Sequence, residues 1–175
     1  MIRQGTLENR ARIVYLGIGS NLGNKKINIE KAKFEIEKNG IKIDLCSSYY
    51  ETSSWPNNKF PNYFNIVLRA KTFLKPHDLL KKIKEIEILV GRKMSLKNHP
   101  RICDIDIIDY DQKNLKIHNK NQKLVIPHQM LHQRNFVLLP LYEIAKNWLH
   151  PKKNKKISEL LTDLGVNNLR SIKQL

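Results

Sequence analysis

The feature that most constrains the fold is an apolar pattern that changes twice from strand spacing to helical spacing and back within 110 residues. Apolar residues recur at helical spacing over 25–38 and over 76–90. A polar loop over 52–61 separates the two strand-helix-strand units. This order favours an α+β, ferredoxin-like βαββαβ sandwich, because a doubly wound parallel sheet would need more strands alternating with helices. Alternating or continuous apolar runs predict the strands at 13–19, 41–50, 63–72 and 103–110.

Length and composition indicate one folded domain, spanning 1–175, with 41% hydrophobic residues. Its ends, 1–11 and about 166–175, are expected to be loosely ordered. No apolar run reaches the roughly 18 residues needed to span a bilayer, and the polar N-terminus lacks a signal-peptide core. We therefore expect a cytoplasmic monomer with no membrane partner. Beyond residue 110 the pattern predicts extra elements: a hairpin at 115–118 and 123–126, mostly helical structure over 127–146 interrupted by Pro140, and a last helix at 157–164.

The formal net charge of +16 at pH 7 raises the question of a nucleic-acid partner. Most basic residues are lysines scattered among Asn and Ile, without an arginine-rich block, and an AT-rich coding sequence also produces this composition. We expect no nucleic-acid partner. Two cysteines, Cys46 and Cys103, are too few for a disulfide framework or a structural zinc site. Both lie in apolar, strand-like runs, so we expect buried, reduced thiols.

The strongest chemical feature is the run from His99 to Asp106, which ends in a carboxylate pair. Side chains alternate along a strand, so Asp104 and Asp106 project on one face, roughly 7 Å apart, with Ile105 on the other. Two neighbouring carboxylates repel each other, and a divalent cation such as Mg²⁺ relieves that repulsion. The alternative, ordinary salt bridges on a solvated sheet face, stays open for so short a pattern.

A basic loop precedes this strand and contains Arg92, Lys93, Lys97 and Arg101. Arginine can bind phosphate oxygens bidentately, and lysine adds a point charge. A metal-binding pair beside cationic side chains is what phosphoryl or pyrophosphoryl transfer requires. Taken alone, the basic loop is equally compatible with a solvated surface run.

A second constellation lies further along the chain. His128 and Arg134 can contact nucleotide phosphates, and Phe136 can stack on a planar ring. Each is weak by itself, because a lone His or Phe is more often structural. No P-loop pattern occurs, and the glycine spacing of 17–23 departs by one residue from the dinucleotide fingerprint. That segment is interpreted as a tight strand-to-helix turn.

Between Ile13 and Leu149, motifs occur in an order that resembles the 6-hydroxymethyl-7,8-dihydropterin pyrophosphokinase family. The resemblance implies a ferredoxin-like fold and transfer of the terminal pyrophosphate of ATP to a pterin hydroxymethyl group, giving AMP, in folate biosynthesis. The motifs are Leu16-Gly17-Ile18-Gly19-Ser20-Asn21-Leu22-Gly23, Ser47-Ser48-Tyr49-Tyr50-Glu51-Thr52, Pro61-Asn62-Tyr63-Phe64-Asn65, Glu87 with Gly91-Arg92, Pro100-Arg101-Ile102-Cys103-Asp104-Ile105-Asp106, and Ile126-Pro127-His128 with Arg134-Asn135-Phe136.

The same resemblance implies roles for individual residues. Asp104 and Asp106 correspond to ligands of two Mg²⁺ ions, and Arg92 and Arg101 to phosphate-binding groups of a mobile catalytic loop. The pterin would lie between Tyr63 and Phe136 and be bonded at its edge by Thr52 and Asn65, with Trp55 at its rim. The co-substrate ATP would be bound by Glu87, Lys97, Lys123, His128 and Arg134.

The chain also departs from the family pattern. Asn98-His99 stands where many relatives have Trp-Gly or a similar pair, Met94 replaces an arginine, and Lys97 replaces another. These changes concern closure of the 92–100 loop more than substrate identity. Ser53-Ser54-Trp55 follows the pterin-site threonine, where relatives have Pro-Pro or Pro-Leu.

Two alternatives from other classes remain. Ferredoxin-like folds with basic surfaces include RNA-binding modules, but the aromatic pattern of those modules is not evident here. An acidic pair would also oppose a phosphate backbone. An inactive relative used for interaction is supported only by the altered basic loop. The presence of Arg101, Asp104 and Asp106 argues against it.

Overall fold

A computed structural model describes residues 10–54, 57–93, 99–119 and 122–175. The elements are β1 (Arg12–Ser20), α1 (Lys25–Lys38), β2 (Lys42–Cys46), β3 (Tyr50–Thr52), β4 (Tyr63–Thr72), α2 (Pro76–Val90), β5 (Asp104–Tyr110), β6 (Leu115–Asn119), β7 (Gln122–Ile126), the 3-10 turn η1 (Leu131–Gln133), α3 (Asn135–Ile144), α4 (Ile157–Leu164), α5 (Val166–Arg170) and β8 (Ile172–Gln174).

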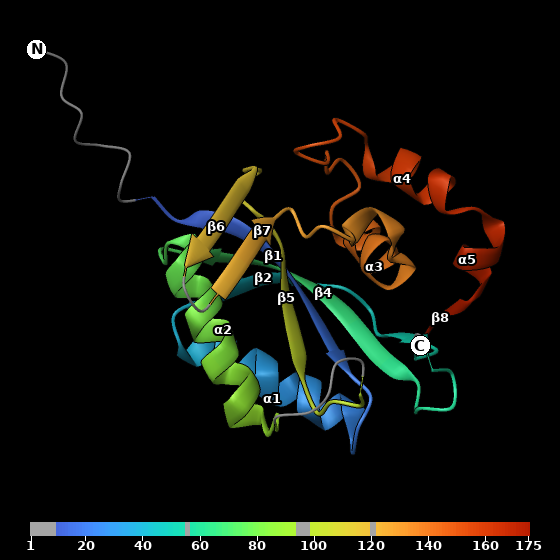
Figure 1. The fold of residues 1–175 in the computed structure, drawn as a ribbon, viewed down its shortest axis with the longest axis horizontal. Coiled ribbons are helices and arrows are strands. Elements are labelled where there is room, and N and C mark those ends of the chain that lie inside the picture. The colour runs from blue at the N-terminus through green and yellow to red at the C-terminus, as the bar shows by residue number, and fades with distance from the viewer. Residues whose placement is uncertain (1–9, 55–56, 94–98, 120–121) are drawn as a thin grey trace, which may run out of the picture.

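The main sheet is antiparallel and runs in the order β5-β1-β4-β3-β8, with β2 also pairing with β4. Strand β1 lies at the centre of the fold, between β5 and β4. Helices α1 and α2 lie on one side of the sheet, and α3 and α4 lie on the other (Figure 1). The order of β5, β1, β4 and β2 confirms the predicted ferredoxin-like arrangement, and β6 and β7 confirm the predicted hairpin.

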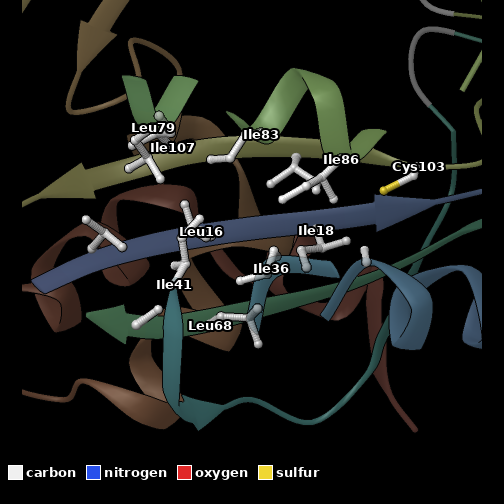
Figure 2. Packing of buried hydrophobic residues seen from close by; sticks show 14 of the residues in the cluster. Leu16, Ile18, Ile36, Ile41, Leu68, Leu79, Ile83, Ile86, Cys103 and Ile107 are labelled. Carbon is white, nitrogen blue, oxygen red and sulfur yellow. The ribbon is translucent and has the colours of Figure 1, made fainter. Parts of the chain in front are cut away.

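The main core lies between the sheet and helices α1 and α2 (Figure 2). Leu16 and Ile18 of β1 point into it and are at most 1% exposed. In an antiparallel sheet, alternate residues share a face, so β4 and β5 contribute Leu68 and Ile105 to the same layer. The helices present residues three or four positions apart, namely Ile29, Ala32 and Ile36 from α1 and Leu79, Ile83, Ile86 and Val90 from α2.

A second, smaller core lies on the opposite face, under α3 and α4. It includes Tyr15, Val67 and Ile108 from three neighbouring strands, with Leu138 and Trp148 above them. Beyond Val67 and Ile108 this face of the sheet carries polar side chains and glycines, which form the site described below.

The predicted strand at 41–50 is interrupted. Strand β2 ends at Cys46, and β3 begins at Tyr50. Between them the backbone N–H of Ser47 donates to the carbonyl of Val67. The N–H of Val67 donates to the Ser47 hydroxyl oxygen, 2.9 Å away, where a regular ladder would use a backbone carbonyl. Thr52, expected at the start of a loop, is the last residue of β3.

The prediction of mostly helical structure over 127–146 is wrong in its first part. A cis peptide bond precedes Pro127, and the regular helix α3 begins only at Asn135. Pro140 does not end that helix. Although a proline removes one N–H···O bond, Pro140 is buried together with Leu138 and Leu141, and this burial offsets the loss.

Two further expectations differ from the structure. Residues 166–175 were expected to be loosely ordered, but they form α5 and β8, and β8 pairs with β3. Cys103 is buried as predicted, whereas Cys46 at the end of β2 is exposed. Over the part of the chain that the structure describes, no helix combines the length and apolar character needed to cross a membrane.

Candidate active site

The candidate site lies on the α3 face of the sheet, where β1, β4 and β5 run beyond the second core. In the strand register Asp104 is opposite Gly19, and Asp106 is opposite Gly17. A Cβ atom at Gly19 would lie only 3.0 Å from Oδ1 of Asn65 on β4. The two glycines therefore leave open the face on which both carboxylates project, as the alternation of β5 predicts.

Asp104 is held by two arginines from opposite ends of the basic loop. Nη1 of Arg92 lies 2.7 Å from one carboxylate oxygen, and Nη1 of Arg101 lies 2.9 Å from the other. Burial opposes ionisation of Asp104, but the two guanidiniums outweigh it and lower the pKa of this carboxyl. The Asp104 side chain keeps 28% exposure, so the ionised group still faces solvent.

Asp106 is held from the other side, by residues that precede α3. Nη1 of Arg134 lies 3.0 Å from its carboxylate, and Nε2 of His128 lies 3.9 Å away. Burial lowers the pKa of His128, partly countered by the charge of Asp106. His128 therefore favours the neutral imidazole at pH 7 and can accept as well as donate a hydrogen bond.

Glu87 comes from α2, which covers the opposite face of the sheet, and its carboxylate reaches the start of β5. Its carboxylate, 1% exposed, accepts a bond from the backbone N–H of Ile105 at 2.7 Å and pairs with Nη1 of Arg92 at 2.6 Å. Gly91, with φ +115°, provides the left-handed turn that brings Arg92 back towards this carboxylate. Lys84 completes the ion pairs, and burial raises the pKa of Glu87. In the structure the Glu87 carboxylate is bonded to Lys84, to Arg92 and to the backbone N–H of Ile105. Its contact with ATP stays a prediction.

The predicted pterin residues occur on adjacent elements next to Gly19. Nδ2 of Asn65 donates to Oγ1 of Thr52 at 2.9 Å, and both side chains are buried. Tyr63, two residues before Asn65, lies on the same face of β4, with its ring near Gly19. Phe136 comes from the first turn of α3, and the Arg134 guanidinium lies 5.5 Å from the centre of its ring.

One residue of this site received no role in the sequence analysis. Asn21 is 2% exposed and uses both ends of its side chain. Its Oδ1 accepts from the backbone N–H of Arg101 at 2.7 Å, while its Nδ2 donates to Oγ of Ser54 and to the carbonyl of Pro61. Asn21 thus ties the turn after β1 to the segment just before β5 and to the loop after β3. The only feature of the sequence that could have indicated a role for Asn21 is its place in the 17–23 motif.

Three predicted site residues cannot be placed. Trp55 and Lys97 lie outside the described residues, as does most of the 92–100 loop, so its predicted mobility is untested. Only the backbone of Lys123 is described, in β7. Of the other predicted residues, Arg92, Arg101, His128 and Arg134 contact the two aspartates.

The donors at the site fit Mg²⁺. Among the residues the structure describes, no cluster of three or more His, Cys, Asp or Glu could hold an ion by itself. Mg²⁺ suits a site with one or two carboxylates, because it retains waters and binds substrate phosphates. Asp104 and Asp106 provide such a pair on one open face.

Comparisons with known proteins agree with this arrangement. The family model described as 7,8-dihydro-6-hydroxymethylpterin-pyrophosphokinase (HPPK) matches residues 15–146. A 2-amino-4-hydroxy-6-hydroxymethyldihydropteridine pyrophosphokinase of Aquifex aeolicus is 40% identical over 146 residues, which cover 83% of this chain and 88% of that protein. The folic acid synthesis protein FOL1 of Dictyostelium discoideum is 44% identical over 139 residues, 79% of this chain.

Several relatives are much longer. This chain spans 20% of the Dictyostelium protein. In a solved structure of Plasmodium falciparum HPPK-DHPS with pteroate, the matching part has a TM-score of 0.76 and 17% identity, covering 94% of this chain and 46% of that one. This likeness shows the fold. The family model and the Aquifex relative show that the chain belongs to the 7,8-dihydro-6-hydroxymethylpterin-pyrophosphokinase family.

Proposed function

We propose that this chain transfers the terminal pyrophosphate of ATP to 6-hydroxymethyl-7,8-dihydropterin, giving AMP and the pterin diphosphate, as a step of folate biosynthesis. The observation that carries the proposal is the pair Asp104 and Asp106, on one open strand face and surrounded by Arg92, Arg101 and Arg134. Membership of the family supports the pterin alcohol as the acceptor.

In this reaction the hydroxymethyl oxygen attacks the β-phosphorus of ATP. The bond from that phosphorus to the oxygen bridging it to the α-phosphate breaks, AMP leaves with the bridging oxygen, and the hydroxyl proton is lost. The chemistry therefore needs an aligned acceptor and compensation of charge on the phosphates.

The charged side chains of the site match that need. Arg92 and Arg101 now share the Asp104 carboxylate, and their planar guanidiniums can bind phosphate oxygens in the same way. Arg134 and the neutral His128 stand beside Asp106 on the side assigned to ATP. These groups provide fixed positive charge and hydrogen bonds where the transferred group would lie.

Asp104 and Asp106 would also hold Mg²⁺, two ions by the family resemblance. When bound, the metal supplies positive charge to phosphate oxygens. The carboxylates of the site are already paired with Lys84 and with three guanidiniums, so little unpaired positive charge is left for polyanionic ATP, and a bound cation would supply it. Without added cation, the substrate phosphates would face the two aspartates.

The acceptor would bind between Tyr63 and Phe136. A flat heterocycle with a polar edge needs a stacking slot and a few aligned polar groups. The Thr52 and Asn65 pair provides an amide and a hydroxyl that are already oriented by their mutual bond. Thr52 and Asn65 thus select the edge of the ring, while the aromatic rings bind its faces.

A coupled assay for AMP, with ATP, MgCl₂ and the hydroxymethyl-dihydropterin, tests the proposal directly. AMP is expected only when the protein, the pterin and the divalent cation are all present. No AMP above the pterin-free blank would refute it. Omitting MgCl₂ and adding EDTA tests the metal requirement separately.

We propose further that the substrates are small molecules only and that the active form is a monomer. Titration of a labelled RNA or DNA oligonucleotide at about 0.15 M salt is expected to show no saturable binding. Light scattering is expected to give the mass of one 20.6 kDa chain. The cytoplasmic location stays a prediction from the sequence.

A further inference from the structure

We propose that the C-terminal segment 166–175, here called the strap, is a positioning element for the pterin slot. It contains α5 and β8 and lies outside residues 15–146, which the family model matches. In Figure 1 it runs from α4 through α5, beside α3, to β8 at the edge of the sheet. The inference rests on the proposed function, because the slot that the strap would position is the one assigned to the pterin.

The first contact of the strap is with the residue that starts α3. Nδ2 of Asn135 donates to the backbone carbonyl of Asn168 at 2.6 Å and to Oγ of Ser171 at 3.0 Å. Asn135 lies between Arg134, which binds Asp106, and Phe136 of the slot. The start of α3 has no side-chain cap of its own. The strap therefore anchors the first turn of the helix that carries one wall of the slot.

The second contact is with the short strand of the opposite wall. In the register of β3 with β8, Thr52 is opposite Ile172 and Tyr50 is opposite Gln174. The backbone N–H of Leu175 donates to the carbonyl of Tyr49 at 2.9 Å, which extends the pairing by one residue. A strand of three residues at the edge of a sheet has little to hold it. The strap thus supports the strand on which Thr52 bonds to Asn65.

A separate contact already fixes the far end of α3. Glu143 accepts bonds from the backbone N–H and the hydroxyl of Ser48 and from the hydroxyl of Tyr50. This contact ties the C-terminal half of α3 to the start of β3. The strap makes the corresponding connection at the N-terminal end, where Phe136 lies. With both connections, α3 is fixed along its length relative to β3.

The strap contributes little to the core. Helix α5 contains no buried residue, and Val166 and Leu175 are exposed. Loss of the strap therefore removes few apolar contacts. Its contacts instead join the two walls of the slot, which is the pattern expected of an element that positions groups rather than one that stabilises the whole fold.

Three variants separate the two contacts. Ending the chain after Gly165 removes the whole strap, and ending it after Ser171 removes only β8. The substitution Asn135→Ala removes only the anchor on α3. The matched control is Asn147→Ala, the same change at an exposed position just after the C-terminal end of α3.

The experiment measures Kd for the hydroxymethyl-dihydropterin and for ATP by calorimetry, with thermal unfolding of each variant. We expect the pterin Kd to rise about fivefold in Asn135→Ala and more in the chain ending at Gly165, since one hydrogen bond contributes about 1 kcal/mol. The ATP Kd is expected to stay within about twofold. The control is expected to match the parent chain in both.

An unchanged pterin Kd in Asn135→Ala and in a folded chain lacking the strap would overturn the proposal. Equal weakening of pterin and ATP binding would also overturn it, because that result indicates general loosening. If the shortened chains do not fold, Asn135→Ala decides alone. The parent chain distinguishes failure of the strap proposal from failure of the proposed function. If the parent chain binds the pterin and forms AMP, the proposed function stands whatever the strap variants show.

Discussion

The two faces of the central sheet use the same strands for different purposes. On the face covered by α1 and α2, Leu16, Ile18, Ile66, Leu68 and Ile105 are at most 1% exposed. On the other face, the residues next to them in the chain carry the candidate chemistry: Gly17, Gly19, Asn65, Asp104 and Asp106.

In this sheet, alternate residues of the same strand serve stability on one face and the candidate chemistry on the other. Because side chains alternate, each strand can be apolar on one face and charged on the other without compromise. A slip of register by one residue would place Asp104 in the core and Ile105 on the face of the candidate site. Substitutions on the two faces should therefore have separable effects, which the following predictions test.

The largest effect is expected on the charged face. Asp104→Ala or Asp106→Ala should lower Mg²⁺-dependent AMP formation by about 1,000-fold or more, because each change removes a charge that would hold the cation in the proposed reaction. Circular dichroism and thermal unfolding should show an intact fold. Retained activity in both variants would remove the metal assignment.

A smaller loss of rate is expected from Arg101→Ala, about 100-fold, with little change in pterin affinity. Its guanidinium is assigned to charge that develops in the transition state rather than to binding of the acceptor. The measurement is kcat and KM for both substrates. An unchanged rate would instead make the Arg101–Asp104 pair a purely structural salt bridge.

On the apolar face the expected effect is on stability. Ile18→Ala should lower the free energy of unfolding by about 2–5 kcal/mol, because it leaves a cavity in the main core. The kcat per folded molecule should change less than in the aspartate or Arg101 variants. Denaturant unfolding and the AMP assay on the same preparation measure both. A large loss of kcat with unchanged stability would break the separation of the two faces.

The smallest effect is expected in the pH dependence of stability. Since the pKa of Asp104 is lower in the folded chain, the unfolded chain binds more protons in the acid range, and stability rises with pH there. The contribution of Asp104 is present above its unfolded pKa and is lost as pH falls through the folded pKa. Asp104→Asn should therefore flatten the acid limb of stability against pH, measured by denaturant unfolding. An unchanged slope would contradict this origin.

The sequence predicted the elements whose signals are local. The strand that carries Asp104 and Asp106, the helix spacing of α1 and α2, and the hairpin were all recognised from periodicity. Local patterns could not show that Asn21 bonds to Arg101, 80 positions away, or that β8 pairs with β3. Such contacts depend on how the elements pack.

Errors arose where tertiary contacts override local preference. Pro140 was expected to interrupt the helix, yet it lies buried inside α3 between Leu138 and Leu141, and the helix continues through it. The run from 41 to 50 looked continuous, but the Ser47 hydroxyl bonds to the β4 backbone and divides it. Cys46 was expected to be buried because its neighbours in the sequence are apolar, but it is exposed at the end of β2.

The buried carboxylate of Glu87 has a consequence for the solubility of the protein. Strand β5 is an edge strand, and such edges pair readily with other chains and start aggregation. Here the N–H of Ile105 is bonded to Glu87, and the carbonyl of Ile108 accepts from the backbone of His128. An incoming strand would find both groups already bonded, so the strand that bears the aspartates is a poor template for association between molecules.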